Sequence, residues 1–386
     1  MTAQLVFWIA IGTLFYTYAG YHLLLKLIAS FIPRTYALDF ASFPGEWVTV
    51  SIVVAAHNEE RVIERRIENL LHLDYPHAKL DLIVASDGSS DRTNEIASSY
   101  AGRGVTLLAL DRVGKGPAQD IAVARAKGDI VIFSDADTEF AADFANVVAG
   151  HFRHDARAGA LAANLKWKIA STSNPPSRLR ELSWKLETDL RETESRLGLL
   201  AGVSGAALAF RKELWKPMRL AINDSDSLTP LDVILQGYRV IFARDAIAYE
   251  VPFTTAKSDF RAKVRGVSKS MVMIPRRWRP RDWARHPLIA WRTFSHHILR
   301  WTAPFAMLTA VLASLFLLRT SIAYQAIVLA EMALALLAVA GYAAARMQKP
   351  LAVASMLSSF VVVNAGFALG FLKAVAGAAQ GLFESE

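Results

Sequence analysis

Two aspartates separated by a single residue are the strongest candidates for chemistry in this sequence. Asp135 and Asp137 follow the apolar run 130–133, which opens at Gly128-Asp129 and is typical of a buried strand of a parallel sheet. Ligands of open α/β sheets bind beyond the carboxyl ends of the strands, and side chains two residues apart in an extended segment point the same way. Both carboxylates can therefore face one cation, and such hard oxygen ligands suit Mg²⁺ or Mn²⁺ bridging to a substrate diphosphate. A polar turn that caps the next helix is the alternative.

The elements that must position these aspartates alternate between strand and helix. The predicted elements are strands near 48–56, 80–86 and 105–110 and helices near 62–71, 92–100 and 118–127. This alternation predicts a doubly wound, Rossmann-like α/β domain with a parallel sheet. The first strand is not followed by Gly-x-Gly-x-x-Gly, and Gly114-Lys115-Gly116 lacks the Walker A spacing, so neither nucleotide-binding motif is present.

The second half of the soluble region departs from this rhythm. It predicts strands near 159–167, 238–243 and 246–250, helices near 177–197 and 228–235, and a strand or loop at 202–210. His151 and His154, and also His296-His297, have no third ligand nearby in the sequence. We expect surface or interfacial histidines there rather than metal sites.

Apolar residues are concentrated at the two ends of the 386-residue chain, in which 53% of all residues are hydrophobic. The stretch from Leu5 to Ile32 is longer than a signal-peptide core and no small-residue cleavage site follows it, so we expect a membrane span. Three further apolar segments, at 298–318, 322–345 and 351–376, are each long enough by the measure of ~20 residues that cross a bilayer.

Basic residues flank the soluble middle of the chain. Arg34 follows the first span, and the segment 260–297, rich in Arg and Trp, precedes the second. The positive-inside rule then predicts a multi-pass inner-membrane protein with the middle domain in the cytoplasm. Interleaved Trp and Arg beside a span predict a segment in the headgroup interface, so the net charge of +8 favours lipid and nucleotide phosphate over nucleic acid. The chain has no cysteine, which excludes disulfides and zinc–thiolate sites.

Four motifs, each at or just after the end of a predicted strand, resemble those of membrane-bound family 2 glycosyltransferases with the GT-A fold. They are Ala55-Ala56-His57-Asn58-Glu59, Asp87-Gly88-Ser89, Gly114-Lys115-Gly116 and Asp135-Ala136-Asp137. The resemblance covers about residues 48–250, and the flanking spans resemble those of the polysaccharide synthases. We therefore expect four parts: a span at 1–33, a cytoplasmic GT-A domain at 34–255, a basic and aromatic interfacial segment at 256–297, and three spans at 298–386.

The resemblance implies a nucleotide-sugar donor, with a UDP-sugar expected. Asp135 and Asp137 would hold the cation that neutralises the leaving diphosphate. Asp87 is similar to the family's uridine-contacting aspartate, because a carboxylate can accept a hydrogen bond from a base N–H or a ribose hydroxyl. The other donor-site candidates are Asn58, Glu59 and Lys115. A solvated loop lysine is the alternative for the last of these.

An inverting transfer also needs a base that takes the proton from the acceptor hydroxyl. In the family this is the second acid of a pair that precedes a helix ending in Gly-Tyr-Arg, here Gly237-Tyr238-Arg239. Counting back along that helix reaches Asp226, and Ser225 stands where the family has the first acid. The alternatives are Asp224, as a loop residue, and Asp232, which faces solvent in the simplest helical arrangement.

A second departure concerns the acceptor. Processive synthases of the family carry Gln-x-x-Arg-Trp near the first C-terminal span, and the corresponding residues here are Ala262, Arg265 and Gly266. Arg265 can still contact the diphosphate, but Gly266 replaces the tryptophan that stacks on the acceptor sugar. Residues around Glu187 to Gly198 resemble the helix before the acceptor-binding segment, and Gly202 to Ala206 resemble that segment.

The expected function is an inverting, metal-dependent transfer of a hexosyl or N-acetylhexosaminyl group to a membrane-proximal or lipid-linked acceptor, in exopolysaccharide or cell-surface glycan synthesis. The alternatives are a processive polysaccharide synthase, a non-catalytic nucleotide-binding membrane scaffold and a transporter of lipid-linked sugar. The expected partners are the donor, a lipid-linked or glycan acceptor and membrane lipids, without nucleic acid; proteins of a biosynthetic complex are possible partners.

Overall fold

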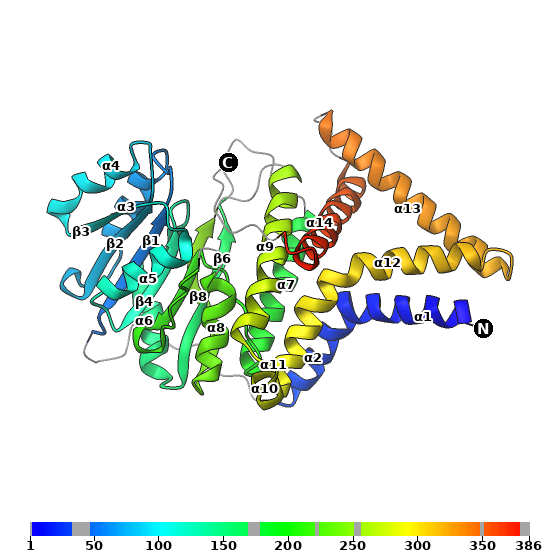
Figure 1. Cartoon of the computed structure of the whole chain (residues 1–386), viewed down its shortest axis with the longest axis horizontal. Helices are drawn as coiled ribbons and strands as arrows, with labels where there is room; N and C mark the ends of the chain where they lie inside the picture. Colours follow the sequence, from blue (N-terminus) through cyan, green and yellow to red (C-terminus); the bar gives the residue numbers. More distant parts are fainter. Residues whose placement is uncertain are drawn as a thin grey trace.

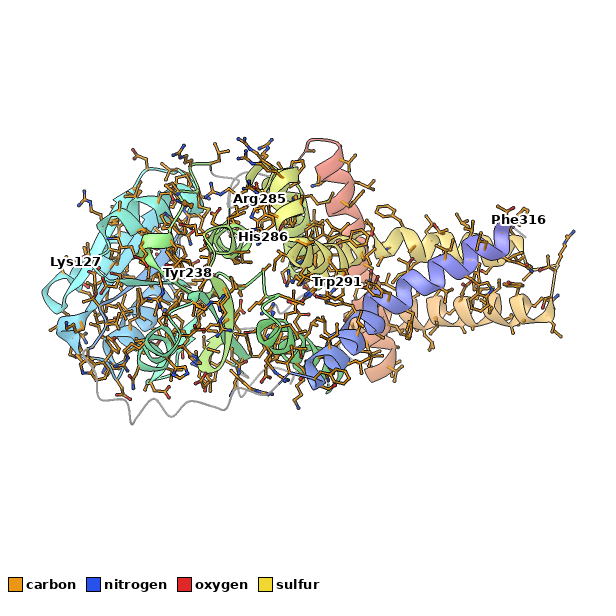
Figure 2. The ribbon with its side chains drawn as sticks, turned by 90° about the horizontal axis from the view of Figure 1, so that it is seen from below. Lys127, Tyr238, Arg285, His286, Trp291 and Phe316 are labelled. Carbon is orange, nitrogen blue, oxygen red and sulfur yellow. The ribbon has the colours of Figure 1, made fainter. Side chains whose placement is uncertain are left out.

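The computed structural model describes residues 2–32, 47–168, 178–220, 224–250, 256–347 and 351–378. An α/β domain fills one end of the molecule and long helices project from the other (Figure 1). Figure 2 shows Lys127 at the far end of the domain, Trp291 where the domain meets the helices, and Phe316 toward the distal end of the helical arm.

One mixed sheet forms the centre of the domain, with strand order β3-β2-β1-β4-β7-β6-β8-β5. The first four strands in this order are parallel, as the alternation predicts; they are β1 (Val50–Ala56), β2 (Leu80–Asp87), β3 (Val105–Leu110) and β4 (Ile130–Asp135). In the second half, β7 (Ala207–Arg211) runs antiparallel to β4 and to β6 (Ala158–Trp167). There β6 pairs in parallel with β8 (Arg239–Glu250), and β5 (Glu139–Phe140) adds an antiparallel edge.

Helices cover both faces of the sheet, because the strands present apolar side chains on both sides. The helices α3 (Ile63–Leu71), α4 (Thr93–Ser99) and α6 (Phe144–His154) pack on one face. The other face is covered by α5 (Lys115–Arg125) and α8 (Ser225–Leu235). Two apolar layers of this kind fix the register of the central strands, since a slip by one residue would exchange the faces that their side chains occupy.

Element boundaries differ from the sequence prediction in the second half. The two strands predicted at 238–243 and 246–250 are one strand, β8, with an irregular register between Ala163 and Asn164 of its partner β6. Only the end of the segment 202–210 is strand, as β7. The predicted helix near 177–197 is α7 (Arg178–Arg196).

Within the described ranges, four helices are long and apolar enough to cross a membrane, at 2–30, 287–316, 322–346 and 353–375. The first comprises α1 (Thr2–Phe15), the π-helical turn η1 (Tyr16–Gly20) and α2 (Tyr21–Ser30). The second comprises α11 (Pro287–Thr293), the π-helical turn η6 (Phe294–Ile298) and α12 (Leu299–Phe316). The last two are α13 (Ile322–Arg346) and α14 (Ala352–Val375).

The segment predicted to lie in the headgroup interface is more deeply packed than its composition indicates. It contains α9 (Ala256–Arg277) and α10 (Pro280–Arg285) before α11. Trp278 belongs to the apolar core beside α8, and Arg292 is paired with a buried carboxylate; each is 1% exposed. An interfacial position is therefore wrong for these two residues, because tertiary contacts bury them.

Candidate active site

The carboxyl ends of β1, β2 and β4 lie at one level, since Ala55 of β1 is paired with Ala85 of β2 and with Asp135 of β4. The polar residues that follow these strands therefore share one edge of the sheet. This arrangement brings the loops after His57, Asp87 and Asp135 together, as the sequence predicts for parallel strands.

Asp87 is buried and already organises the neighbouring loop. Its carboxylate accepts hydrogen bonds from Val113 N at 2.7 Å and from Gly114 N at 3.0 Å, and His57 Nδ1 lies 2.8 Å from the Asp87 carbonyl oxygen. An ionised carboxylate has about four lone-pair sites, so these bonds leave capacity for a further donor. Asp87 can thus shape the donor pocket and contact a ligand at the same time.

Asn58 and Glu59 tie the loop after β1 to the loop after β2. The backbone N–H of Asn58 donates to Ser89 Oγ at 3.1 Å, and its side-chain oxygen accepts from Ser90 N at 2.8 Å. The backbone N–H of Glu59 donates to Thr93 Oγ1 at 2.8 Å, so the Glu59 carboxyl group is left to face the other acids of the site.

Lys115 lies in the middle of the candidate site and is not a solvated loop lysine. Its Nζ donates to Asp135 Oδ1 at 2.6 Å, and its side chain is 14% exposed. Burial lowers the pKa of Lys115, but the carboxylates of Asp135, Asp226 and Asp224 outweigh burial and raise it. One ammonium group therefore faces both the strand-end aspartate and the candidate base.

An excess of negative charge surrounds Asp137, which lies exposed just beyond β4. Burial, together with the charges of Asp137 and Asp135, raises the pKa of Glu59 to about 7. The same causes raise the pKa of Glu250, at the end of β8, to about 7. Sequence reasoning missed Glu250, whose only signal was an acid at the end of a predicted strand.

The donor set fits a divalent cation held by few protein ligands. Among the residues that the structure describes, no three His, Asp or Glu side chains are grouped closely enough to hold a metal by themselves. Carboxylates whose mutual repulsion raises their pKa favour a bound cation, and Mg²⁺ usually keeps water and substrate phosphate among its ligands. Asp137, with Asp135 behind it, is the pair that could hold such an ion.

Asp226 lies at the first turn of α8, and its charge acts on Lys115 as that of Asp135 does. Its carboxylate packs against Gly205, where a Cβ would collide with it, and Asp224 Oδ1 accepts from Asp226 N at 3.4 Å. Burial and the neighbouring Asp224 carboxylate raise the pKa of Asp226 well above its usual range. Asp226 is therefore the more basic member of this pair and the better proton acceptor.

Asp232 is not the solvent-facing residue that helical periodicity predicts. It is buried, and its two oxygens accept from Arg277 Nε at 2.7 Å and from Arg277 Nη2 at 2.6 Å. Because α9 crosses α8 at this point, the polar face of α8 is covered. This bidentate pair explains Asp232 as a structural residue and leaves Asp224 and Asp226 as the acids of the site.

One cation of α9 lies near the acidic pair, and a second lies near the first. Lys269 is buried; desolvation lowers its pKa, while the Asp224 carboxylate raises it. Arg265, the sequence candidate, lies one helical turn earlier and is close enough for its charge to act on Lys269. Sequence reasoning missed Lys269, because only the packing of α9 on α8 brings it to the site.

Of the adjacent histidines of the second span, for which a surface or interfacial position was expected, His296 is buried by protein contacts and His297 is partly exposed. His296 is 4% exposed and lies 2.7 Å from Glu194 Oε1 through Nδ1. His297 Nε2 lies 2.6 Å from Arg292 Nη1. The π-helical turn directs both rings inward, which a regular helical pattern would not indicate.

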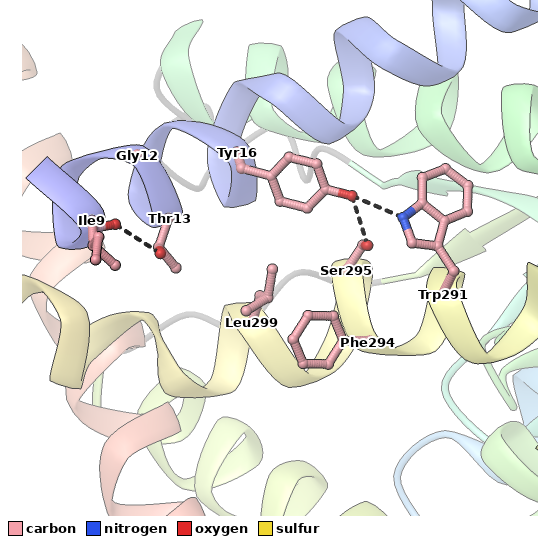
Figure 3. A pocket seen from close by; sticks show the side chains of 8 residues that line it. All are labelled: Ile9, Gly12, Thr13, Tyr16, Trp291, Phe294, Ser295 and Leu299. Atoms are coloured by element: carbon pink, nitrogen blue, oxygen red, sulfur yellow. Dashed lines mark hydrogen bonds between the residues drawn. The ribbon is translucent and has the colours of Figure 1, made fainter.

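A groove of 500 Å³ separates the first two spans close to the domain. Figure 3 shows Ile9, Gly12 and Leu299 along it and, at its domain end, Tyr16 hydrogen-bonded to Ser295 and Trp291. Tyr16 OH lies 2.8 Å from Ser295 Oγ, and Trp291 Nε1 donates to Tyr16 OH at 3.1 Å. The hydroxyl of Thr13, a further lining residue, donates to the Ile9 carbonyl oxygen at 2.9 Å. The remaining walls are apolar, so the groove suits a hydrocarbon chain.

Comparison with known proteins gives one family and several relatives. Residues 51–216 match the model of the family described as glycosyl transferase family 2. A probable glycosyltransferase of Bacillus subtilis, YdaM, is 26% identical over 233 residues, covering 56% of this chain and 54% of YdaM. A poly-β-1,6-N-acetyl-D-glucosamine synthase of Staphylococcus aureus is 24% identical over 224 residues, covering 56% and 53%. The chain thus spans about half the length of these two curated relatives.

A third relative and one solved structure extend the comparison. A β-monoglucosyldiacylglycerol synthase of Trichormus variabilis is 34% identical over 132 residues, which cover 33% of this chain and 27% of the relative. The mannosyltransferase PcManGT of Pyrobaculum calidifontis, solved with GDP-Man and Mn²⁺, superposes with a TM-score of 0.70 at 23% identity, covering 96% of this chain and 99% of PcManGT. The latter similarity shows that the two proteins share the GT-A fold.

Proposed function

We propose a function from the premise that this chain carries a glycosyl transferase family 2 domain on a GT-A fold. The proposed reaction is the inverting transfer of one sugar from a nucleotide-sugar donor to an acceptor at the membrane. The observation that carries the proposal is the placement of Lys115 between Asp135 at the strand end and the acidic pair Asp224 and Asp226. The groups that would act on the donor and those that would act on the acceptor are therefore both next to Lys115.

The residues divide into a donor half and an acceptor half. Asp87, Asn58 and the loop before α5 would bind the nucleotide, with a UDP-sugar as the proposed donor. Asp135 and Asp137 would hold Mg²⁺ or Mn²⁺, which when bound would neutralise charge on the departing diphosphate. The Lys115 ammonium, already shared between the two halves, would face the same diphosphate oxygens.

On the acceptor side, Asp226 would take the proton from the acceptor hydroxyl. The hydroxyl oxygen then forms a bond to the anomeric carbon on the face opposite the diphosphate, and the bond to the diphosphate oxygen breaks. A base with a raised pKa is suited to this step, because the driving force for proton transfer grows with its basicity. Asp224 would keep the pKa of Asp226 raised, whereas the positive charges of Lys115 and Lys269 would favour its ionised form.

The acceptor that these features favour is a lipid, and the transfer is single. Gly266 offers no ring on which an acceptor sugar could stack, and a Cβ added there would meet no atom within 4 Å. The groove between the first two spans can take a hydrocarbon chain close to the soluble domain. Of the relatives, one is named for a polymer and one for a glycolipid, so processive synthesis is the second candidate.

We place the catalytic domain in the cytoplasm of a multi-pass inner-membrane protein. Exposed Arg276, Arg279, Arg281 and Arg285 precede the second span, and the cytoplasmic side of spans carries an excess of such residues. A nucleotide-sugar donor is also a cytoplasmic metabolite in this scheme, so the orientation and the reaction require the same side of the membrane.

The test is a donor screen with the full chain in nanodiscs, following nucleotide release with diacylglycerol or polyprenyl phosphate present. Asp226→Asn is expected to lower kcat by roughly 10²–10⁴-fold without changing donor affinity, because general base catalysis contributes about that much. Asp137→Ala is expected to weaken donor binding in Mn²⁺. Unchanged turnover in both variants would contradict the assigned roles, and binding without turnover for every donor would favour a scaffold. Product masses separate single transfer from a polymer ladder.

A further inference from the structure

A buried polar cluster lies where the membrane-spanning helices meet the soluble domain. Its centre is Glu194, near the end of α7, which is 0% exposed. Arg292 Nε and Nη2 donate to Glu194 Oε2 at 3.0 and 2.8 Å, and Tyr21 OH donates to Oε1 at 3.0 Å. His296 Nδ1 lies 2.7 Å from the same Oε1. The first and second spans thus hold one carboxylate of the soluble domain between them.

The π-helical turn η6 gives this cluster a second layer. It places the rings of His296 and His297 in a stack, with centroids 5.1 Å apart and planes inclined by 11°. Turns of this kind are frequent at functional sites, and ionisable side chains within apolar spans are rare. Glu187, earlier on α7, adds ion pairs of 3.3 Å to Arg300 and to Arg191. Burying this many charged side chains has a large desolvation cost, which an interface that only joined the domain to the spans would not require.

The chain that leaves α7 passes directly over the cluster. Leu199 N donates to the Glu194 carbonyl oxygen at 2.7 Å. At Gly202, a Cβ would lie 3.2 Å from His297 Nε2 and 3.5 Å from Arg292 Nη1, so the backbone passes close to the cluster and an added methyl group would have to displace the His297 ring slightly. Three residues later, Gly205 supports the carboxylate of Asp226. Segment 202–205 therefore contacts the cluster at one end and the candidate base at the other.

We propose that Glu194 and Arg292 are positioning residues that hold segment 202–205 on the membrane-spanning helices and so set where the acceptor meets Asp226. This inference rests on the proposed transfer function. The donor half of the site is built from the loops after β1, β2, β3 and β4, whereas the side-chain partners of Glu194 and Arg292 lie on α2, α11 and η6. The cluster consequently acts on the acceptor step and leaves donor binding alone.

The test compares two variants in the full chain in nanodiscs. Gly202→Ala crowds His297 and Arg292, and Glu194→Gln removes the charge that Arg292 binds. Both are expected to lower transfer to diacylglycerol or polyprenyl phosphate by roughly ten- to a hundredfold and to raise the acceptor KM, because misplacement by 1 Å can cost about 10²-fold. Donor affinity, and donor hydrolysis without acceptor, are expected to stay at the wild-type level.

Two matched controls isolate the effect. Gly102→Ala changes an exposed glycine with no atom within 4 Å of the added Cβ, and Glu192→Gln removes a carboxylate of the same helix that pairs with Arg244 at the surface. Both are expected to transfer like the wild type. The inference is overturned if Gly202→Ala matches Gly102→Ala, or if donor affinity falls in parallel with transfer. A folding defect in Glu194→Gln would leave Gly202→Ala to decide. A wild-type chain that turns over no donor would instead refute the proposed function.

Discussion

At the scale of single residues, the candidate site is defined by unequal charge. One ammonium group, on Lys115, is shared among Asp135, Asp224 and Asp226, while Glu59 and Glu250 face Asp137 across the mouth of the site. Repulsion among these carboxylates destabilises the folded chain until protons or a cation neutralise them. The excess of negative charge that lowers the stability of the folded chain therefore favours binding of a divalent ion together with a diphosphate.

Burial of Glu59, together with its repulsion by Asp137 and Asp135, predicts a pH-dependent gain in stability for Glu59→Gln. The pKa of Glu59 rises from its ordinary 4.5 to about 7 in the folded chain. Between these values the folded state binds more protons than the unfolded state, so stability falls as pH rises, and the full penalty is present above pH 7. Glu59→Gln should therefore be more stable than the wild type at pH 8 by about 1 kcal/mol, after solvent screening, and should lose this advantage near pH 4.5.

Thermal unfolding in detergent micelles with a chelator present measures this difference, with the exposed Glu64→Gln as control. Added Mn²⁺ should reduce the difference in stability between Glu59→Gln and the wild type, because the ion neutralises the acids in the wild type. A Glu59→Gln variant that is less stable than the wild type at pH 8 would show that the carboxylate has a favourable partner in the fold.

At the scale of elements, α9 connects the site to the membrane. It was expected as a surface segment, yet it packs between α8 of the soluble domain and α14. It brings Lys269 to the acidic pair, with Arg265 close to Lys269, and Arg277 near its end forms an ion pair with Asp232 of α8. The position of the candidate base therefore depends on a helix that sequence composition assigns to the lipid surface.

The ion pair between Arg277 and Asp232 predicts that Arg277→Met lowers the stability of the protein by a large amount. Removing the guanidinium leaves the Asp232 carboxylate buried without its bidentate partner, and breaking a buried pair in this way costs about 3 kcal/mol or more. Arg276→Met, at the exposed neighbouring position, should change stability by less than about 0.5 kcal/mol. Denaturant unfolding followed by circular dichroism compares the two. Equal stabilities would mean that water reaches Asp232 and replaces the arginine.

At the scale of the whole molecule, the last span is part of the same unit as the soluble domain. Gly366 and Gly370, four residues apart on α14, face α9 so closely that a Cβ at position 370 would lie 2.9 Å from the Val264 carbonyl oxygen. Small residues at this spacing allow helix backbones to approach within membranes. The spans therefore do more than anchor the domain: α14 supports α9, and the first two spans hold α7.

This packing predicts that Gly370→Leu disturbs both stability and transfer. The added side chain must displace α9, and overpacking of this kind costs about 1–3 kcal/mol. Ala365→Leu adds the same kind of bulk on an exposed face of α14 and should be neutral. Melting temperature and sugar transfer in nanodiscs test both variants. Normal values for Gly370→Leu would mean that α14 moves independently of α9.

Much of the fold and part of the site follow from local patterns in the sequence. Runs of apolar residues ending in Asn58, Asp87 and Asp135 predicted parallel strands whose polar ends would meet, and the structure places them at one edge. The apolar pattern of a buried strand involves consecutive residues, so it can be recognised without knowledge of the rest of the chain. The four apolar segments could be predicted equally well, because crossing a bilayer requires length and hydrophobicity alone.

Only the tertiary structure decided which charges face one another. Lys115 and Asp135 are close because α5 packs against β1 and β2 and begins at the edge of the sheet where β4 ends. Glu250 joins the acids because β8 lies in the far half of the mixed sheet. Likewise, Glu194 meets Arg292 across 98 residues of sequence. Such pairs form only where two distant elements pack against each other. The periodicity of a helix does not show which neighbouring element covers its polar face. The sequence by itself therefore determined the strand-end aspartates and the spans, whereas packing between distant elements decided what neutralises the charges and what holds the acceptor segment.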